Sequence, residues 1–137
     1  MISFQHIETS IAINKKNIIE IINSIVLEEN KNVGELSLVF CNDTYLLKIN
    51  KQFLDHDFFT DVITFDYCEG NVISGDILIS LERVKENAEL FNVDFLNELH
   101  RVIIHGLLHL LKYKDKTKQE KKIMKNKEDY YLNKEWN

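Results

Sequence analysis

Apolar residues recur along this chain with two different periods, which predict a succession of helices and strands. A spacing of three and four residues indicates an amphipathic helix. This spacing is seen at Ile18, Ile19, Ile22, Ile25 and Val26. Strict alternation of apolar and polar residues indicates a half-buried strand. Alternate positions are apolar at Leu36, Leu38 and Phe40. A further short strand is expected over residues 2–4.

The middle of the chain continues the alternation of helices and strands. Asp43 is expected to cap a helix that ends at the polar run of residues 55–57. Residues 61–67 and 72–80 read as two strands, and the turn residues between them predict a hairpin.

Three helices are expected in the rest of the chain. One follows Ser80, a second begins near Asp94, and Thr117 with Glu120 forms a capping box that predicts the last. Strands and helices therefore interleave, which favours the α+β class, with a small mixed β-sheet covered by helices.

Composition indicates one intracellular domain. The 137 residues are 45% hydrophobic, enough for one core and too few for two ordinary domains, so residues 1–137 are expected to form a single domain. Two cysteines, Cys41 and Cys68, and the lack of a signal peptide or a long apolar span predict a cytoplasmic protein without a membrane segment.

The sequence HGLLHLLKYKD contains the strongest chemical signal. His105 and His109 are four residues apart in a helix-forming stretch, so their Cβ atoms lie about 6 Å apart on one face. A turn after the helix can bring the Asp115 carboxylate back over both imidazoles. Three such ligands with an open fourth position are typical of a catalytic zinc site, although another divalent transition metal would also fit.

Chance histidine pairs on helices are common, so the surroundings of this pair matter. The two histidines interrupt an apolar run, where an unpaired imidazole would be costly. Gly106 costs about 1 kcal/mol against alanine inside a helix, which indicates that a neighbouring strand or a substrate backbone passes close to it.

Charge is distributed unevenly along the chain. The formal net charge is −5, which argues against indiscriminate nucleic-acid binding, yet residues 112–127 contain eight lysines and only two acidic residues. Beside a metal, these lysines could hold an RNA backbone in a salt-dependent way. The alternative is an ordinary solvated helix face.

Three segments in order resemble the YbeY family of ribosomal RNA maturation factors. His105, Gly106, Leu108, His109, Leu110 and Tyr113 match the family signature HGxLHLxGYDH. Thr60, Asp61, Val62 and Phe65 agree with the family segment TDVLSF, and the segment that contains Asp76 falls where the family has LGDI. The resemblance implies a zincin-like fold and a metal-dependent endoribonuclease specific for single strands.

Departures from the family pattern concern the site itself. Asp115 stands where the family has its third histidine, and a carboxylate is also a competent zinc ligand. Lys112 replaces a glycine after the helix, where a left-handed backbone would cost it roughly 1 kcal/mol. Leu54 replaces an arginine that is implicated in activity, so another cation must act in its place or none does.

The resemblance implies an enzyme of ribosomal RNA maturation and ribosome quality control. Its partners would be single-stranded ribosomal RNA and either small-subunit ribosomal proteins or a ribosome-associated GTPase. Asp76 and then Asp61 are the candidates for orienting a water or a ligand, unless each is an ordinary strand-end carboxylate. The alternatives are a non-catalytic assembly factor with a structural metal and a metal-dependent hydrolase of another substrate.

Overall fold

A four-stranded mixed sheet forms the centre of the computed structural model, which describes residues 1–134. The strands are β1 (Ile2–His6), β2 (Asn32–Cys41), β3 (Val62–Asp66) and β4 (Val72–Ser80), in the order β1-β2-β4-β3. The β1, β2 and β4 strands are parallel, and β3 runs antiparallel to β4 as the first arm of the predicted hairpin.

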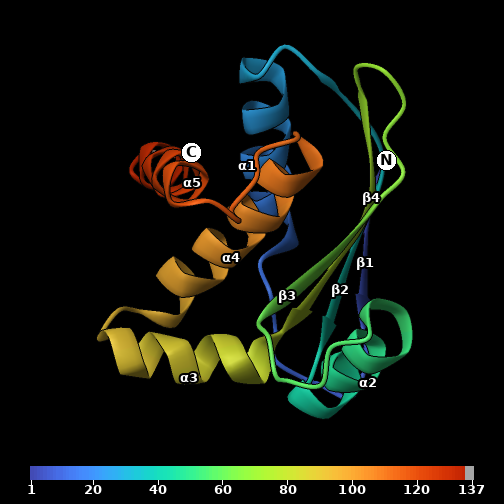
Figure 1. Cartoon of the computed structure of the whole chain (residues 1–137), viewed down its shortest axis with the longest axis vertical. Coiled ribbons are helices and arrows are strands. Elements are labelled where there is room, and N and C mark those ends of the chain that lie inside the picture. The colour runs from blue at the N-terminus through green and yellow to red at the C-terminus, as the bar shows by residue number, and fades with distance from the viewer. Residues whose placement is uncertain (135–137) are drawn as a thin grey trace.

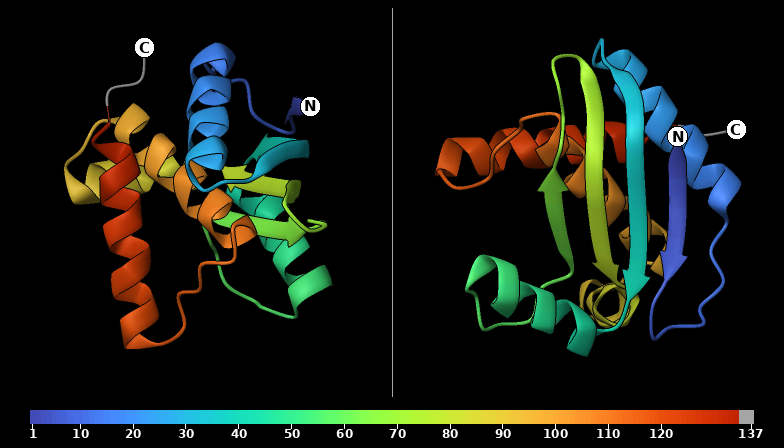
Figure 2. Two further views of the ribbon diagram at one scale, coloured as in Figure 1. Left: turned by 90° about the horizontal axis from the view of Figure 1, so that it is seen from above. Right: turned by 90° about the vertical axis from the view of Figure 1, so that its right-hand side faces the viewer.

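The helices lie mainly on one side of this sheet (Figures 1 and 2). They are α1 (Lys15–Glu28), α2 (Asp43–Leu54), α3 (Leu81–Phe91), α4 (Phe95–Leu110) and α5 (Lys118–Leu132). Figure 2 shows α1 and α4 behind the sheet and α2 in front of part of it. The structure thus confirms the α+β class and the mixed sheet covered by helices. No helix of residues 1–134 combines the length and apolar character that a bilayer span requires.

Alternation along β4 assigns its side chains to two separate hydrophobic clusters. Ile77 and Ile79 belong to the main core with α1 and α4, whereas Leu78 packs in a smaller cluster with Leu46 of α2. Because successive strand residues point to opposite faces, Asp76 faces the α2 side of the sheet.

Side-chain caps fix where four of the helices begin, among them α1, where Asn14 accepts a hydrogen bond from the Asn17 amide. Asn42 caps α2 by accepting a 2.8 Å hydrogen bond from the Tyr45 amide. The expectation that Asp43 is this cap is therefore wrong, because Asp43 is buried and accepts 2.7 Å hydrogen bonds from Ser80 and Arg83 instead. Ser80 also caps α3. The predicted capping box of Thr117 and Glu120 is present at the start of α5.

Gly106 allows α4 to lie directly against the sheet. A Cβ at this position would lie 3.0 Å from Cγ2 of Ile77 and 3.3 Å from Cγ2 of both Thr64 and Val62. The neighbouring strands β3 and β4 thus explain the missing side chain, one of the two explanations that the sequence offered. This close approach holds the carboxyl end of α4 beside β3, which forms one edge of the sheet.

Candidate metal centre

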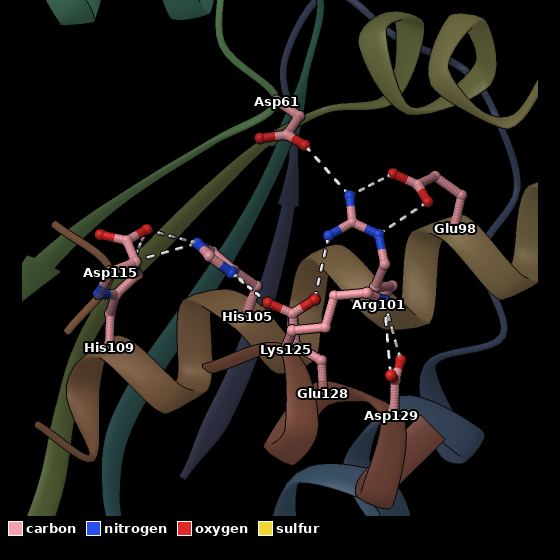
Figure 3. Close-up of polar contacts among 9 residues, drawn as sticks. All are labelled: Asp61, Glu98, Arg101, His105, His109, Asp115, Lys125, Glu128 and Asp129. Carbon is pink, nitrogen blue, oxygen red and sulfur yellow. Dashed lines mark hydrogen bonds and ion pairs between the residues drawn. The ribbon is translucent and has the colours of Figure 1, made fainter. Parts of the chain in front are cut away.

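Three side chains converge where α4 ends (Figure 3). The Nε2 atoms of His105 and His109 lie 3.1 Å apart. Asp115 Oδ2 lies 3.3 Å from Nε2 of His105 and 3.2 Å from Nε2 of His109. All three residues are half-buried. The structure therefore brings together the same three residues that the sequence spacing selected.

The separations between these atoms fit a tetrahedral ion. Ligands about 2.0–2.1 Å from a tetrahedral zinc lie about 3.3–3.4 Å from one another. The three observed separations are 3.1, 3.2 and 3.3 Å, so a small outward adjustment of the side chains suffices. Two imidazoles and one carboxylate are also a donor set that zinc commonly accepts. The residues present thus form a possible metal site with a fourth position toward solvent.

The turn after α4 sets the position of Asp115. Lys112 adopts a left-handed backbone with φ of 77°, and the Tyr113 amide donates to the Leu108 carbonyl at 3.0 Å, which is a Schellman ending. The Tyr113 hydroxyl donates to Glu29 at the end of α1, at 2.6 Å. The capping box fixes the far end of the loop. The carboxylate is thus anchored on both sides by local structure.

Glu128 of α5 orients the first imidazole. Its Oε2 lies 2.6 Å from Nδ1 of His105, and its side chain is only 7% exposed. A ring that ligates a metal through Nε2 carries its proton on Nδ1, so Glu128 fixes both the tautomer and the ring plane. Burial favours the neutral imidazole, but the hydrogen bond and charge of Glu128 outweigh it and raise the pKa of His105.

Arg101, one turn before His105, connects the other carboxylates around the site. Its guanidinium lies 3.2 Å from Glu128 Oε1, donates from Nε to Glu98 Oε1 at 2.8 Å, and lies 3.6 Å from Asp61 Oδ2 (Figure 3). Burial raises the pKa of Asp61, although the positive charge of Arg101 opposes this shift. Arg101 thus links Asp61 in the wall of the cleft to Glu128, the residue behind the His105 imidazole.

An open cleft of about 420 Å³ surrounds the three converging side chains. Besides them it is lined by Leu54 and by residues 60–64, which include Asp61. None of these lining residues is a lysine or arginine. Leu54 therefore stands at the cleft as the resemblance suggests, and Arg101 does not replace the missing cation, because it does not line the cleft and its charge faces carboxylates.

The remaining residues singled out from the sequence lie in two different places. Asp61 lines the cleft, but Asp76 does not, because strand alternation turns it to the opposite face of the sheet. Glu128 and Arg101 were missed in the sequence. Glu128 follows Met124 and precedes Tyr131 at helical spacing, and both neighbours are buried. A carboxylate within a buried helical stripe is the signal that could have found it.

The lysine-rich segment divides into structural and exposed residues. Lys127 is half-buried, lies 3.2 Å from Glu29 and rests over the rings of Tyr113 and Tyr131. Lys112 pairs with Asp66. Lys125 pairs with Asp129 at 3.3 Å. Five further lysines on the loop and α5 are exposed: Lys114, Lys116, Lys118, Lys121 and Lys122. Two of them flank Asp115 in the chain.

Fold and site together define an α+β protein with a possible metal centre of two histidines and one aspartate in an open cleft. Residues 2–135 match the family model described as endoribonuclease YbeY. The endoribonuclease YbeY of Flavobacterium psychrophilum is 51% identical over 133 residues, which are 96% of this chain and 94% of that protein. The endoribonuclease YbeY of Bacteroides fragilis is 49% identical over 88% of this chain and 86% of its own length.

The chain therefore belongs to the endoribonuclease YbeY family, whose members are nucleases that hydrolyse phosphodiester bonds. A solved structure agrees with this assignment at the level of the fold. The solution structure of TM1509 from Thermotoga maritima superposes with a TM-score of 0.68 at 31% sequence identity. The match covers 96% of this chain and 87% of that one.

Proposed function

We propose that this chain is a zinc-dependent endoribonuclease that cleaves single-stranded ribosomal RNA in the cytoplasm during ribosomal RNA maturation and ribosome quality control. Family membership supports the endoribonuclease activity. The observation that supports metal dependence is the convergence of two imidazole nitrogens and one carboxylate oxygen within an open cleft. Small-subunit ribosomal proteins or a ribosome-associated GTPase are the proposed partners.

His105, His109 and Asp115 would hold the ion. Zinc held in this way supplies an activated water near neutral pH and a Lewis acid for the phosphodiester. Glu128 keeps the His105 ring in its ligating orientation. Among residues 1–134, Asp61 is the one other carboxylate that lines the cleft, and we assign it the orientation of the attacking water.

A protease reaction of the zincin type is disfavoured at this site. In HExxH proteases a glutamate directly follows the first histidine and acts as general base. Here that position is Gly106, where even a Cβ would lie 3.0 Å from the Ile77 side chain. The glutamate therefore has neither a counterpart nor room, and hydrolysis of RNA fits the residues better.

The exposed lysines provide a second contact for RNA. Lys116, Lys118, Lys121 and Lys122 are proposed to hold the phosphate backbone as it leaves the cleft. Their joint replacement by glutamine should weaken RNA binding and flatten its salt dependence while zinc content stays constant. An unchanged salt slope would identify these lysines as a solvated surface.

One observation favours a second candidate, a non-catalytic assembly factor. The cleft lining offers no lysine or arginine for the charge that develops on the phosphate, and Leu54 is apolar. Loss of one such donor can cost about 10²–10³ in rate. If the wild type cleaves RNA slowly and a folded Leu54→Arg variant cleaves it faster, the result would support the endoribonuclease over the assembly factor.

The deciding experiment compares cleavage of one single-stranded RNA by wild type, His109→Ala and His100→Ala. His100 lies on α4 but does not line the cleft, so it controls for changes to the helix. We expect a chelator and His109→Ala to abolish cleavage, and His100→Ala to retain it. Equal cleavage by wild type and His109→Ala would refute the ribonuclease. Ribosome maturation supported by His109→Ala would favour the assembly factor.

A further inference from the structure

Two exposed phenylalanines directly precede the cleft-lining residue Thr60 in the chain, and we call this segment, Phe58 and Phe59, the lip. Phe58 is 56% exposed and Phe59 is 53% exposed, on the loop that joins α2 to β3. Leu54, the last residue of α2, lines the cleft, and so do Thr60 and Asp61 at the far end of the loop. Since consecutive Cα atoms are about 3.8 Å apart, Phe59 and Phe58 stand within one and two residues of that lining.

The loop is held in place even though its rings face solvent. The side-chain amide of Asn50, which is buried in α2, donates to the Phe58 carbonyl at 3.0 Å. The His56 ring stacks on Phe58 with centroids 5.1 Å apart and planes at 22°. The Arg83 guanidinium lies 5.2 Å from the Phe59 ring centroid. Both rings are thus presented on a fixed loop instead of being buried beneath it.

Charge around the lip leaves little for phosphate contacts, because the Arg83 guanidinium beside Phe59 is already paired with Asp43 at 2.7 Å and with Glu86 at 2.8 Å. The loop carries Asp55 and Asp57, the second of which pairs with Lys51 at 3.2 Å. The cleft lining contains Asp61 and Asp115 but no lysine or arginine. A polyanion therefore gains little from its backbone at this end of the cleft. The attraction available here is that of aromatic faces for unpaired bases, since every base has a π-face.

We propose that Phe58 and Phe59 form a stacking platform for unpaired bases of the RNA substrate beside the metal centre. This inference rests on the proposed function, because it takes RNA as the polymer that enters the cleft. The platform gives the cleft a preference for single strands: bases in a duplex are already stacked on their neighbours and cannot reach the rings. The phosphate backbone would meet the exposed lysines at the other end.

The test measures binding of a labelled single-stranded RNA with a chelator present to stop cleavage. The variants are Phe58→Ala, Phe59→Ala and Phe58→Trp. Phe91→Ala is the matched control, because Phe91 is 55% exposed but lies at the far end of α3. We expect each alanine at the lip to weaken binding by about fivefold or more. Phe58→Trp and Phe91→Ala should bind like wild type.

A second oligonucleotide separates stacking from a general effect on the loop. It has the same backbone and charge but abasic residues at its centre. Wild type should prefer the RNA with bases, and the lip variants should lose this preference at any salt concentration. Equal affinity of Phe58→Ala, Phe59→Ala and Phe91→Ala for the single-stranded RNA would overturn the inference. It would also be overturned if a protein bound at the lip and left the affinity for RNA unchanged.

Failure of this inference is distinguishable from failure of the proposed function. Metal-dependent cleavage that survives in Phe58→Ala with unaltered RNA affinity refutes the platform alone. Equal cleavage by wild type and His109→Ala refutes the proposed function, whereas the binding comparison with the abasic strand still decides whether the lip stacks bases. A wild type without measurable affinity for single-stranded RNA would overturn the platform as well.

Discussion

Replacement of Glu128 by glutamine should weaken metal binding without removing a ligand. Glu128 contacts His105 at 2.6 Å and Arg101 at 3.2 Å, and its side chain is 7% exposed (Figure 3). Glutamine keeps the shape but removes the charge. Glutamine has one amide oxygen where glutamate has two carboxylate oxygens, so it can accept a hydrogen bond from either the imidazole or the guanidinium. The other of these two donors then faces the NH₂ group, which is itself a donor.

The size of the effect follows from the bonds that change. Hydrogen bonds to a charged group contribute about 1.5–3 kcal/mol, against about 0.5–1.5 kcal/mol for neutral ones. Loss of roughly 1.4 kcal/mol at His105 corresponds to about tenfold in affinity, at the lower end of the 10–100-fold typical of such supporting residues. Arg101 keeps its contacts with Glu98 and Asp61, so the variant should remain folded.

The assay is competition for zinc with a chromogenic chelator, with urea unfolding of the zinc-free protein measured in parallel. Asp129→Asn is the matched control, because Asp129 is the next residue of α5 and pairs only with the exposed Lys125 among the described salt bridges. It should bind zinc like wild type. A folded Glu128→Gln protein with wild-type affinity would refute the claim that Glu128 orients the His105 imidazole.

Three further predictions concern neighbouring features. Asp115→Ala should lower zinc affinity by a large factor in the same competition assay and Asp115→His should retain or raise it; no change in Asp115→Ala would mean that the third ligand lies elsewhere. Lys112→Gly should raise the free energy of unfolding by about 1 kcal/mol in urea titrations, because φ of 77° strains every residue but glycine, whereas Lys112→Ala should not. Burial disfavours the Glu29 charge, but hydrogen bonds from Tyr113, Tyr131 and Lys127 outweigh it and lower the pKa of Glu29 from 4.5. Its stabilisation is therefore present above pH 4.5 and lost as the pH falls below, so the stability difference between wild type and Glu29→Gln should shrink in acid; a constant difference would contradict this.

Local patterns predicted most of the secondary structure and the three side chains that converge in the cleft. The spacing of His105 and His109 fixes a shared helix face whatever the tertiary structure, and the polar run after them leaves a turn that returns Asp115. The capping box at Thr117 is equally local, and it is present. These features depend on neighbours in the chain, which is why one sequence sufficed to find them.

The contacts between distant elements could not be read in the same way. Glu128 is 23 residues from His105, and their contact depends on how α5 packs on α4. The position of Asp76 away from the cleft could not be predicted, because its side of the sheet depends on which strand residues face α4. Had Ile77 been assigned to the main core, alternation alone would have turned Asp76 away from the histidines.

Packing of α5 on α4 also has a consequence for folding cooperativity. Two candidate ligands lie on α4, the third lies on the loop that follows, and the carboxylate behind His105 belongs to α5. A bound ion would therefore stabilise the state in which α5 is packed on α4 relative to the state in which this C-terminal segment is locally unfolded. Amide hydrogens of α5 should then exchange more slowly in proportion to zinc occupancy, which would make the C-terminal helix a reporter of whether the candidate site holds metal.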